Sequence, residues 1–364
     1  MKVAIIHYWL VAMRGGEAVV EQLLEMFPDA HVFTHVADRS VLTGRLAEVG
    51  ITESRVARLP GARRHYQKYL GAMPRALEEL DLSGYDLVIS SESGPAKGVI
   101  VPPGARHLCY VHSPMRYIWD HYHPYAERLG PVGRAYFSRL AHRLRIWDVT
   151  TAARVDSFVA NSSFVASRIE RYYRRQADVV HPPVDLGAYR LPDTPADRQR
   201  YLFVSQLVPY KRADLVIEAF RGSDRQLDVV GDGSERARLA RDLPGNVRLL
   251  GRVPFAELPA LYQNARALIF PAEEDFGIVP VEAMACGTPV LAYSGGGARD
   301  SVIGDETGLF FDRQDTASIR DAMDRFEARP DAFDPARLNA HAQRFGAERF
   351  RAEMRVAIDR MMAR

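Results

Sequence analysis

Short apolar runs rich in β-branched residues alternate with helical patterns through the C-terminal half of this 364-residue chain. After each run comes a loop, and then a segment whose apolar residues recur at three and four positions. This alternation predicts a parallel sheet with helices on both faces. The predicted strands are residues 201–207, 226–231, 246–251, 267–272, 289–294 and 307–311.

The N-terminal half follows the same plan less regularly. A predicted strand at 3–9 precedes Gly15-Gly16 and a helix, and further strands are predicted at 31–36, 85–91, 107–113 and 157–163. A chain of this length exceeds what one hydrophobic core usually supports. We therefore expect two Rossmann-like, doubly wound α/β domains, 1–183 and 184–345, joined by a proline-rich linker near Pro183. A final helix, 346–364, is expected to pack back on the first domain.

Composition narrows the class of protein. The net charge of +2 gives no argument for nucleic acid, and 47% hydrophobic residues are ordinary for a globular protein. Cys109 and Cys286 lie far apart, which indicates neither a disulfide framework nor a metal cluster and fits a reducing compartment. His7 interrupts the first apolar run, and no run reaches the roughly 18–20 residues of a membrane span. We expect a cytoplasmic protein.

Polar and glycine residues follow the predicted strands of the second domain. Because the carboxyl ends of parallel strands share one edge of a sheet, we expect these residues to gather there, in a cleft between the two sheets. Lysine, arginine, glycine backbone and helix N-termini together favour a phosphorylated anion. The residues concerned are Lys211, Arg212, Gly231, Gly233, Arg252-Val253, Glu274 and the triple glycine 295–297.

Glu274 and Glu282 stand eight positions apart in a mostly apolar stretch, where a carboxylate is costly unless it has a partner. Glu282 can accept hydrogen bonds from ribose hydroxyls, and Glu274 from sugar hydroxyls. With an anion site between them, the pattern predicts a nucleotide-sugar donor. Simpler interpretations stay open: a solvent-facing helical glutamate, a lysine that caps a helix, and a glycine turn.

The stretch E-D-F-G-I-V-P-V-E-A-M-A-C-G-T-P-V (274–290) resembles the signature of retaining glycosyltransferases of family 4, which have the GT-B fold. L-V-P-Y-K-R (207–212), G-D-G-S-E (231–235) and G-G-G-A-R-D-S-V (295–302) support the resemblance, as does Y-V-H-S-P-M-R-Y-I-W-D (110–120) in the first domain. One departure is Ser205-Gln206, which stands where the family has an arginine. Arg212 is the expected substitute.

The resemblance implies roles for individual residues. Lys211 would bind the donor diphosphate, with Gly15 and Gly16 closing from the first domain. Glu274 would contact the donor sugar, and Glu282 the ribose. The remaining implied donor contacts are the backbone of Phe276, Gly277, Ile278 and Val279, the base-pocket residue Val253, and His112, which would meet sugar and acceptor. A purely structural role for His112 stays open.

Within the family, the motifs resemble bacterial O-antigen and exopolysaccharide mannosyltransferases, so the implied reaction is hexose transfer, with GDP-mannose as the favoured donor. The resemblance also implies retention of anomeric configuration. No D-x-D triplet occurs, and His121-x-His123 lacks a third ligand nearby, so we expect no metal and no cofactor besides the nucleotide-sugar co-substrate.

Two arginine-rich, acid-free segments, 54–77 and 128–145, suggest an acceptor or membrane surface. The residues singled out are Arg63, Arg64, Lys68 and Tyr117. The expected partner is a glycan or a polyprenyl-diphosphate-linked acceptor at the inner membrane face, not nucleic acid; a solvated basic surface is the alternative. Two other functions stay open: a GT-B nucleotide-sugar epimerase, and a non-catalytic homologue that acts as a scaffold.

Overall fold

The computed structural model describes residues 1–194, 198–329 and 331–364. It divides into two compact units, Met1–Pro183 with Phe350–Arg364, and Val184–Arg349. Residues 195–197 of the predicted linker lie outside the described residues.

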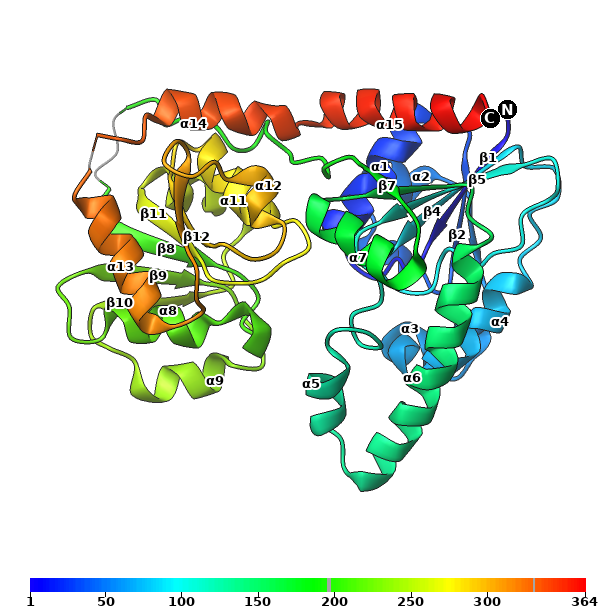
Figure 1. Ribbon diagram of the computed structural model, residues 1–364, viewed down its shortest axis with the longest axis horizontal. Helices are drawn as coiled ribbons and strands as arrows, with labels where there is room; N and C mark the ends of the chain where they lie inside the picture. Colours follow the sequence, from blue (N-terminus) through cyan, green and yellow to red (C-terminus); the bar gives the residue numbers. More distant parts are fainter. Residues whose placement is uncertain (195–197, 330) are drawn as a thin grey trace. The chain divides into compact units, whose positions relative to one another are not determined.

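The first unit is built on a seven-stranded sheet with the order β3-β2-β1-β4-β5-β6-β7 (Figure 1), in which every neighbouring pair is parallel. Its strands are β1 Val3–His7, β2 His31–Thr34, β3 Ile51–Glu53, β4 Leu87–Glu92, β5 Arg106–Val111, β6 Ser157–Ala160 and β7 Ala177–Val179. Every residue of β1 and β4 is buried, which explains the apolar run at the start of each strand. The edge strands β3 and β7 were not predicted, because three residues carry too little pattern.

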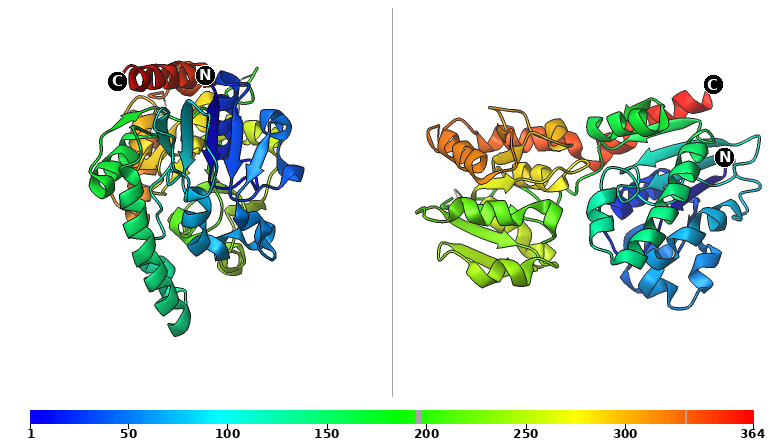
Figure 2. Two further views of the ribbon diagram at one scale, coloured as in Figure 1. Left: turned by 90° about the vertical axis from the view of Figure 1, so that its right-hand side faces the viewer. Right: turned by 60° about the horizontal axis from the view of Figure 1, so that its bottom comes forward.

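Helices of this unit come from both ends of the chain. Figure 1 shows α15 (Ala347–Met362) beside α1 (Gly15–Met26), and Leu23 and Met354 share one core. The long helix α6 (Pro131–Ala152) extends away from the sheet in both figures (Figure 2). The other α-helices are α2 Gly44–Glu48, α3 Ala62–His65, α4 Met73–Glu78, α5 Tyr122–Glu127 and α7 Ser163–Tyr173.

The second unit has a six-stranded parallel sheet with the order β10-β9-β8-β11-β12-β13. Its strands are β8 Arg200–Val204, β9 Gln226–Val230, β10 Val247–Gly251, β11 Ala265–Phe270, β12 Val290–Tyr293 and β13 Gly308–Phe311. All six match predicted strands within a few residues. The sheet of each unit therefore has the predicted doubly wound, parallel form.

Two groups of helices cover this second sheet: α8 packs with α13, and α11 packs with α10 and α14. The α-helices are α8 Ala213–Phe220, α9 Arg236–Leu239, α10 Leu258–Gln263, α11 Ile278–Ala285, α12 Ala298–Ser301, α13 Thr316–Glu327 and α14 Pro335–Ala342. The helix predicted at 235–243 is shorter than expected. It gives way to a 3-10 turn, Ala240–Asp242, and Leu243 is extended because Pro244 follows.

Each sheet has one point where the strand order reverses, between β1 and β4 in the first unit and between β8 and β11 in the second. Ligands of open α/β sheets bind at the carboxyl ends of the strands that flank such a point. His7 and Glu92 end the flanking strands of the first unit, and Val204 and Phe270 those of the second. These ends locate the candidate site.

Candidate functional site

Lys211 and Glu274 meet at the reversal point of the second unit. Lys211 ends the 3-10 helix η4 (Pro209–Lys211) that follows β8, and Glu274 lies in the loop after β11. The Lys211 ammonium forms an ion pair with Oε1 of Glu274, and the two side chains are 12% and 21% exposed. The structure thus joins the two residues predicted for diphosphate and sugar, and leaves both reachable from solvent.

The triple glycine supports the loop that carries Glu274. A Cβ on Gly296 would lie 2.5 Å from the carbonyl oxygen of Glu274, and one on Gly297 would lie 2.2 Å from that of Asp275. The Gly297 amide donates a hydrogen bond of 2.8 Å to the Glu274 carbonyl. Gly296 and Gly297 are therefore glycines because two backbone segments pack directly on one another, whereas a Cβ on Gly295 would meet the side chain of Tyr293.

Helix α11 begins immediately beyond this loop. Gly277, before its first residue, has φ +86°, in the region that favours glycine, and has no side chain that could cap the helix. The first amides of a helix lack partners within it. The amides of Ile278 and Val279 are thus available to an anion at the same strand ends as Lys211.

Glu282 has a protein partner that the sequence did not reveal. Its Oε2 accepts a hydrogen bond of 2.8 Å from the hydroxyl of Tyr262 in α10. Burial raises the pKa of the Glu282 carboxyl, and the hydrogen bond from Tyr262 opposes that rise. Glu282 is thus partly buried, and one of its carboxylate oxygens is already hydrogen-bonded within the fold.

Arg212, the expected second diphosphate cation, pairs with the carboxylate of Asp214. Its guanidinium lies against the Asp214 carboxylate, with Nε–Oδ1 and Nη2–Oδ2 distances of 3.2 and 3.3 Å. Its own backbone is left-handed, with φ +57°, which turns the side chain toward the first turn of α8. Gln206, at the position of the family's arginine, is exposed.

Gly231, Gly233 and Val253 also have structural explanations. A Cβ on Gly231 would lie 1.8 Å from the Ser205 carbonyl oxygen, and one on Gly233 would lie 2.3 Å from that of Leu207. Both glycines are thus required by backbone packing alone. Val253, just beyond the end of β10, lines a hollow of about 840 Å³ together with the first residues of β8 and β9.

In the first unit, His7, Ser91 and His112 form a hydrogen-bonded row at the reversal point. The Ser91 hydroxyl oxygen is 3.0 Å from Nδ1 of His7 and 2.8 Å from Nε2 of His112. Burial lowers the pKa of His112 to about 3, and His7 adds to the shift, so the ring is neutral near pH 7.

Gly15 and Gly16 open α1 beside this row. A Cβ on Gly16 would lie 2.7 Å from the hydroxyl of Tyr8 and 3.5 Å from Cε1 of His7. The predicted glycine pair is thus close to the row of His7, Ser91 and His112, which the sequence did not predict as a group.

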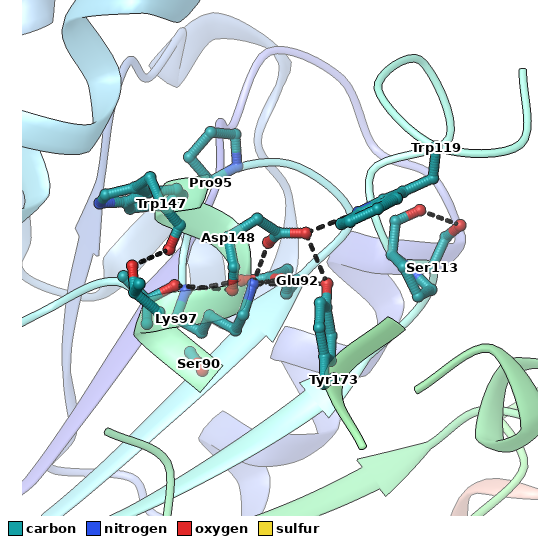
Figure 3. A network of polar contacts seen from close by, with 12 residues as sticks. Ser90, Glu92, Pro95, Lys97, Ser113, Trp119, Trp147, Asp148 and Tyr173 are labelled. Atoms are coloured by element: carbon teal, nitrogen blue, oxygen red, sulfur yellow. Dashed lines mark hydrogen bonds and ion pairs between the residues drawn. The ribbon is translucent and has the colours of Figure 1, made fainter. Parts of the chain in front are cut away.

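Glu92, Lys97 and Asp148 form a buried ionic cluster (Figure 3). The sequence did not predict this cluster. The Lys97 ammonium contacts Oε1 of Glu92 at 2.8 Å and also pairs with Asp148 in α6. Asp148 accepts further hydrogen bonds from Trp119 Nε1 at 2.8 Å and from the Tyr173 hydroxyl at 3.0 Å. Two features of the sequence could have indicated the cluster: Lys97 lies in the apolar stretch 94–101, and Glu92 ends a strand that begins with apolar residues.

Burial lowers the pKa of the Lys97 ammonium, but the carboxylates of Asp148 and Glu92 outweigh it, so the net shift is upward. Burial also raises the pKa of Glu92. The cluster fixes the start of the loop that follows β5, because the His112 amide donates to the Glu92 carbonyl at 2.8 Å.

Buried Arg168 holds both ends of the segment 113–120 that follows His112. Its guanidinium donates to Ser113 Oγ at 2.9 Å and to Asp120 Oδ1 at 2.7 Å. The motif H-S-P-M-R-Y-I-W-D is therefore fixed at Ser113, Trp119 and Asp120.

The predicted acceptor residues have three different environments. Arg63 and Arg64 are exposed, and Arg63 lies 3.5 Å from Glu53. Lys68 lines a hollow of about 560 Å³ with Tyr136, Arg139 and Arg143. Tyr117 is partly buried, and its hydroxyl is buried and makes no hydrogen bond to the described residues. Among the described residues, no helix is both long and apolar enough to cross a membrane.

Two family descriptions, taken together, match nearly the whole chain. Residues 192–345 match "Glycosyl transferases group 1", and residues 13–188 match "Glycosyltransferase Family 4". A D-inositol 3-phosphate glycosyltransferase of Frankia alni is 35% identical over 43% of this chain and 45% of its own length. The corresponding protein of Thermobispora bispora is 32% identical over 52% and 53%. The chain thus spans about half the length of the curated relatives it matches.

Solved structures are similar over the full length. Sucrose-phosphate synthase from Thermosynechococcus elongatus has a TM-score of 0.75 at 18% identity, with all of both chains covered. Anabaena HepE in complex with UDP-glucose has a TM-score of 0.71 at 17% identity, covering 99% of this chain and 100% of its own. At such identities the likeness concerns the fold, and with the two parallel-sheet units it confirms the predicted GT-B class.

Proposed function

We propose that this chain, a glycosyltransferase family 4-like protein of the GT-B fold, transfers a hexose from a nucleotide-diphosphate sugar to a glycan or lipid-linked acceptor, with retention of configuration. The observation that carries the proposal is the Lys211–Glu274 ion pair at the reversal point of the second sheet, beside the uncapped start of α11.

The pair suggests how a donor would bind. A diphosphate offers Lys211 more negative charge than one carboxylate does, so the ammonium can exchange Glu274 for phosphate oxygens. Glu274 is then free to accept hydrogen bonds from sugar hydroxyls. As the bond between sugar and diphosphate breaks, charge grows on the leaving phosphate, and Lys211 with the first amides of α11 would stabilise it.

Two resemblances suggest the donor. Resemblance to O-antigen and exopolysaccharide mannosyltransferases favours GDP-mannose, whereas a fold neighbour was solved with UDP-glucose. These two donors are the first candidates for a cell-surface polysaccharide pathway. Because Lys211 supplies a cation at the leaving group and no D-x-D triplet occurs in the sequence, we propose that transfer needs no metal.

The test is a donor panel in the presence of EDTA: GDP-mannose, UDP-glucose, UDP-N-acetylglucosamine, UDP-galactose and GDP-fucose. We expect the intact protein to hydrolyse one donor slowly, and Glu274→Gln to lower that turnover by about 10²-fold. Glu273→Gln is the matched control, because Glu273 is exposed in the same loop. Equal turnover by the intact protein and Glu274→Gln would remove Glu274 from the site.

The same experiment separates the alternatives. An epimerase would release an epimerised donor sugar without any acceptor, whereas a transferase would form a new glycosidic bond once acceptor is added. A scaffold would bind or turn over no donor. Product analysis by mass spectrometry and NMR distinguishes the three.

The acceptor surface is proposed to be the hollow formed by the segment Tyr66–Ala72 and helix α6. Lys68, Arg139 and Arg143 line it, and none has a carboxylate partner among the described residues. Exposed Tyr136 on the same wall adds apolar area. Unpaired cations beside an aromatic residue suit an anionic, partly apolar partner such as a lipid diphosphate at the inner leaflet.

Vesicle co-sedimentation at low salt tests this surface. We expect binding to vesicles with anionic phosphatidylglycerol and not to pure phosphatidylcholine. The triple change Lys68→Gln, Arg139→Gln and Arg143→Gln should abolish binding, whereas Arg39→Gln, an exposed cation elsewhere in the unit, should not. A protein that ignores anionic vesicles would exclude membrane docking and leave a soluble glycan as the acceptor.

A further inference from the structure

We infer that Glu17, acting through His7 and Ser91, sets the tautomer of His112 so that Nδ1 of His112 is a hydrogen-bond acceptor. The inference rests on the proposed function in one respect: the group that donates to Nδ1 of His112 is taken to be a hydroxyl of a bound sugar. His112 is then the residue that touches substrate, and the other three are positioning residues.

The four side chains form one continuous row. Glu17 Oε1 lies 3.8 Å from His7 Nε2, His7 Nδ1 lies 3.0 Å from Ser91 Oγ, and Ser91 Oγ lies 2.8 Å from His112 Nε2. Glu17, His7 and Ser91 are buried, so water does not compete for these contacts. The other Glu17 oxygen accepts the Arg14 amide at 3.0 Å, which fixes the carboxylate.

When both rings are neutral and Ser91 donates to one of them, two proton arrangements are possible, because Ser91 has one hydroxyl proton to donate. If Ser91 donates to His112, then His7 must donate from Nδ1, and its bare Nε2 lone pair faces the Glu17 carboxylate. If Ser91 donates to His7, then His7 carries its proton on Nε2, facing Glu17, and His112 donates from its own Nε2 to Ser91.

Glu17 decides between the two arrangements. His7 Nε2 is buried and has no hydrogen-bond partner among the described residues, so Glu17 Oε1 is the charged group that faces it. A carboxylate attracts an N–H and repels a lone pair. The second arrangement is therefore favoured, since the partner of one ring nitrogen fixes the proton on the other.

The favoured arrangement determines which nitrogen of His112 carries the proton. With its proton on Nε2, His112 has a bare Nδ1, which makes no hydrogen bond to the described residues. A bare nitrogen accepts from a hydroxyl and repels a phosphate or carboxylate oxygen. The row would thus select a sugar hydroxyl at this position and disfavour an anionic group.

The test is the tautomer of His112 measured by 15N NMR on protein labelled at its histidines, with the His112 signals assigned from His112→Gln. We expect a protonated Nε2 and a bare Nδ1. In Glu17→Gln, the amide oxygen can keep the Arg14 contact while its NH2 group faces His7, so the His112 proton should move toward Nδ1.

Ser91→Ala should interrupt the row, so that adding Glu17→Gln to it changes the His112 signals no further. Ser90→Ala is the matched control, because its hydroxyl is 2.9 Å from a different buried histidine, His107, and it should leave His112 unchanged. If Ser91→Ala fails to fold, Ser91→Thr retains the hydroxyl and should keep the intact protein's tautomer. A His112 proton on Nδ1 in the intact protein, or no response to Glu17→Gln, would overturn the inference.

Activity provides a separate readout. If a donor is turned over, Ser91→Ala should lower kcat by roughly tenfold with little change in KM, the scale of one lost hydrogen bond in the transition state. The NMR result needs no donor. The expected tautomer without any donor turnover would support the inference about the row and contradict the proposed function. Donor turnover with the proton on Nδ1 of His112 would support the proposed function and contradict the inference about the row.

Discussion

In the second unit, Glu282, Lys211 and Glu274 each contact another side chain of the protein. These contacts affect how the result of a substitution is interpreted. Glu282 was expected to hold ribose and is also the acceptor for Tyr262. Lys211 and Glu274 pair with one another, so removal of either leaves the other without its partner. A substitution at these positions therefore changes the fold and the site together, and needs a control for each.

For Glu282, the two roles can be separated by comparing Glu282→Ala with Tyr262→Phe. If Glu282 holds ribose, Glu282→Ala should weaken donor binding by about 1.5–3 kcal/mol, the size of hydrogen bonds to a charged group, and Tyr262→Phe should weaken it less. Isothermal titration with the nucleotide diphosphate measures both. Unchanged affinity in Glu282→Ala, with lowered stability, would leave Glu282 a structural residue.

At the scale of elements, close backbone packing and buried charge hold the strand ends in place. Gly231 and Gly233 let the loop after β9 lie directly on the loop after β8, and Gly296 and Gly297 do the same for the loops after β12 and β11. In the first unit, the Glu92–Lys97–Asp148 cluster connects β4 with α6.

Gly231→Ala should destabilise the second unit by about 3 kcal/mol, because its Cβ would lie 1.8 Å from the Ser205 carbonyl and its φ is +134°. Hydrogen exchange of the amides of β8 and β9, read by mass spectrometry, should show faster exchange there. Gly245→Ala is the control, since nothing lies within 4 Å of a Cβ at that exposed position. Similar protection in both variants would show that the backbone adjusts.

Lys97→Met should destabilise the first unit by about 3–5 kcal/mol, because it leaves the buried carboxylates of Glu92 and Asp148 without their cation. The intrinsic fluorescence of Trp9, Trp119 and Trp147 reports this unit alone, since all three tryptophans of the chain lie in it. Urea titration gives the free energy of unfolding. Arg39→Met, which removes an exposed cation, should leave that value within about 0.5 kcal/mol.

At the scale of the whole molecule, three histidines with lowered pKa values should make the stability of the first unit depend on pH. Burial lowers the pKa of His35 and His107 to about 4, and that of His112 to about 3. Between those values and about 6.5, the unfolded chain binds protons that the folded chain does not, so stability falls as pH falls.

From pH 6.5 to pH 5, each of these histidines should lower the free energy of unfolding by up to about 2 kcal/mol. Urea titrations followed by tryptophan fluorescence at pH 7, 6 and 5 measure the loss. His107→Gln, which has no proton to gain, should lose less stability over this range than the intact protein. A variant that loses as much would show that His107 takes up its proton without unfolding.

The sequence by itself determined the six strands of the second sheet, five strands of the first and the edge on which Lys211 and Glu274 gather, because period, turn residues and the carboxyl-end rule are local properties of the chain. It also pointed to the GT-B class through motifs. It did not reveal the Tyr262–Glu282 contact, the turning of Arg212 to Asp214, the row from Glu17 to His112, or the joining of Lys97 and Asp148 across 51 positions. Those contacts depend on strand order and helix packing, which bring together residues that no sequence period relates, so only the tertiary structure decided them.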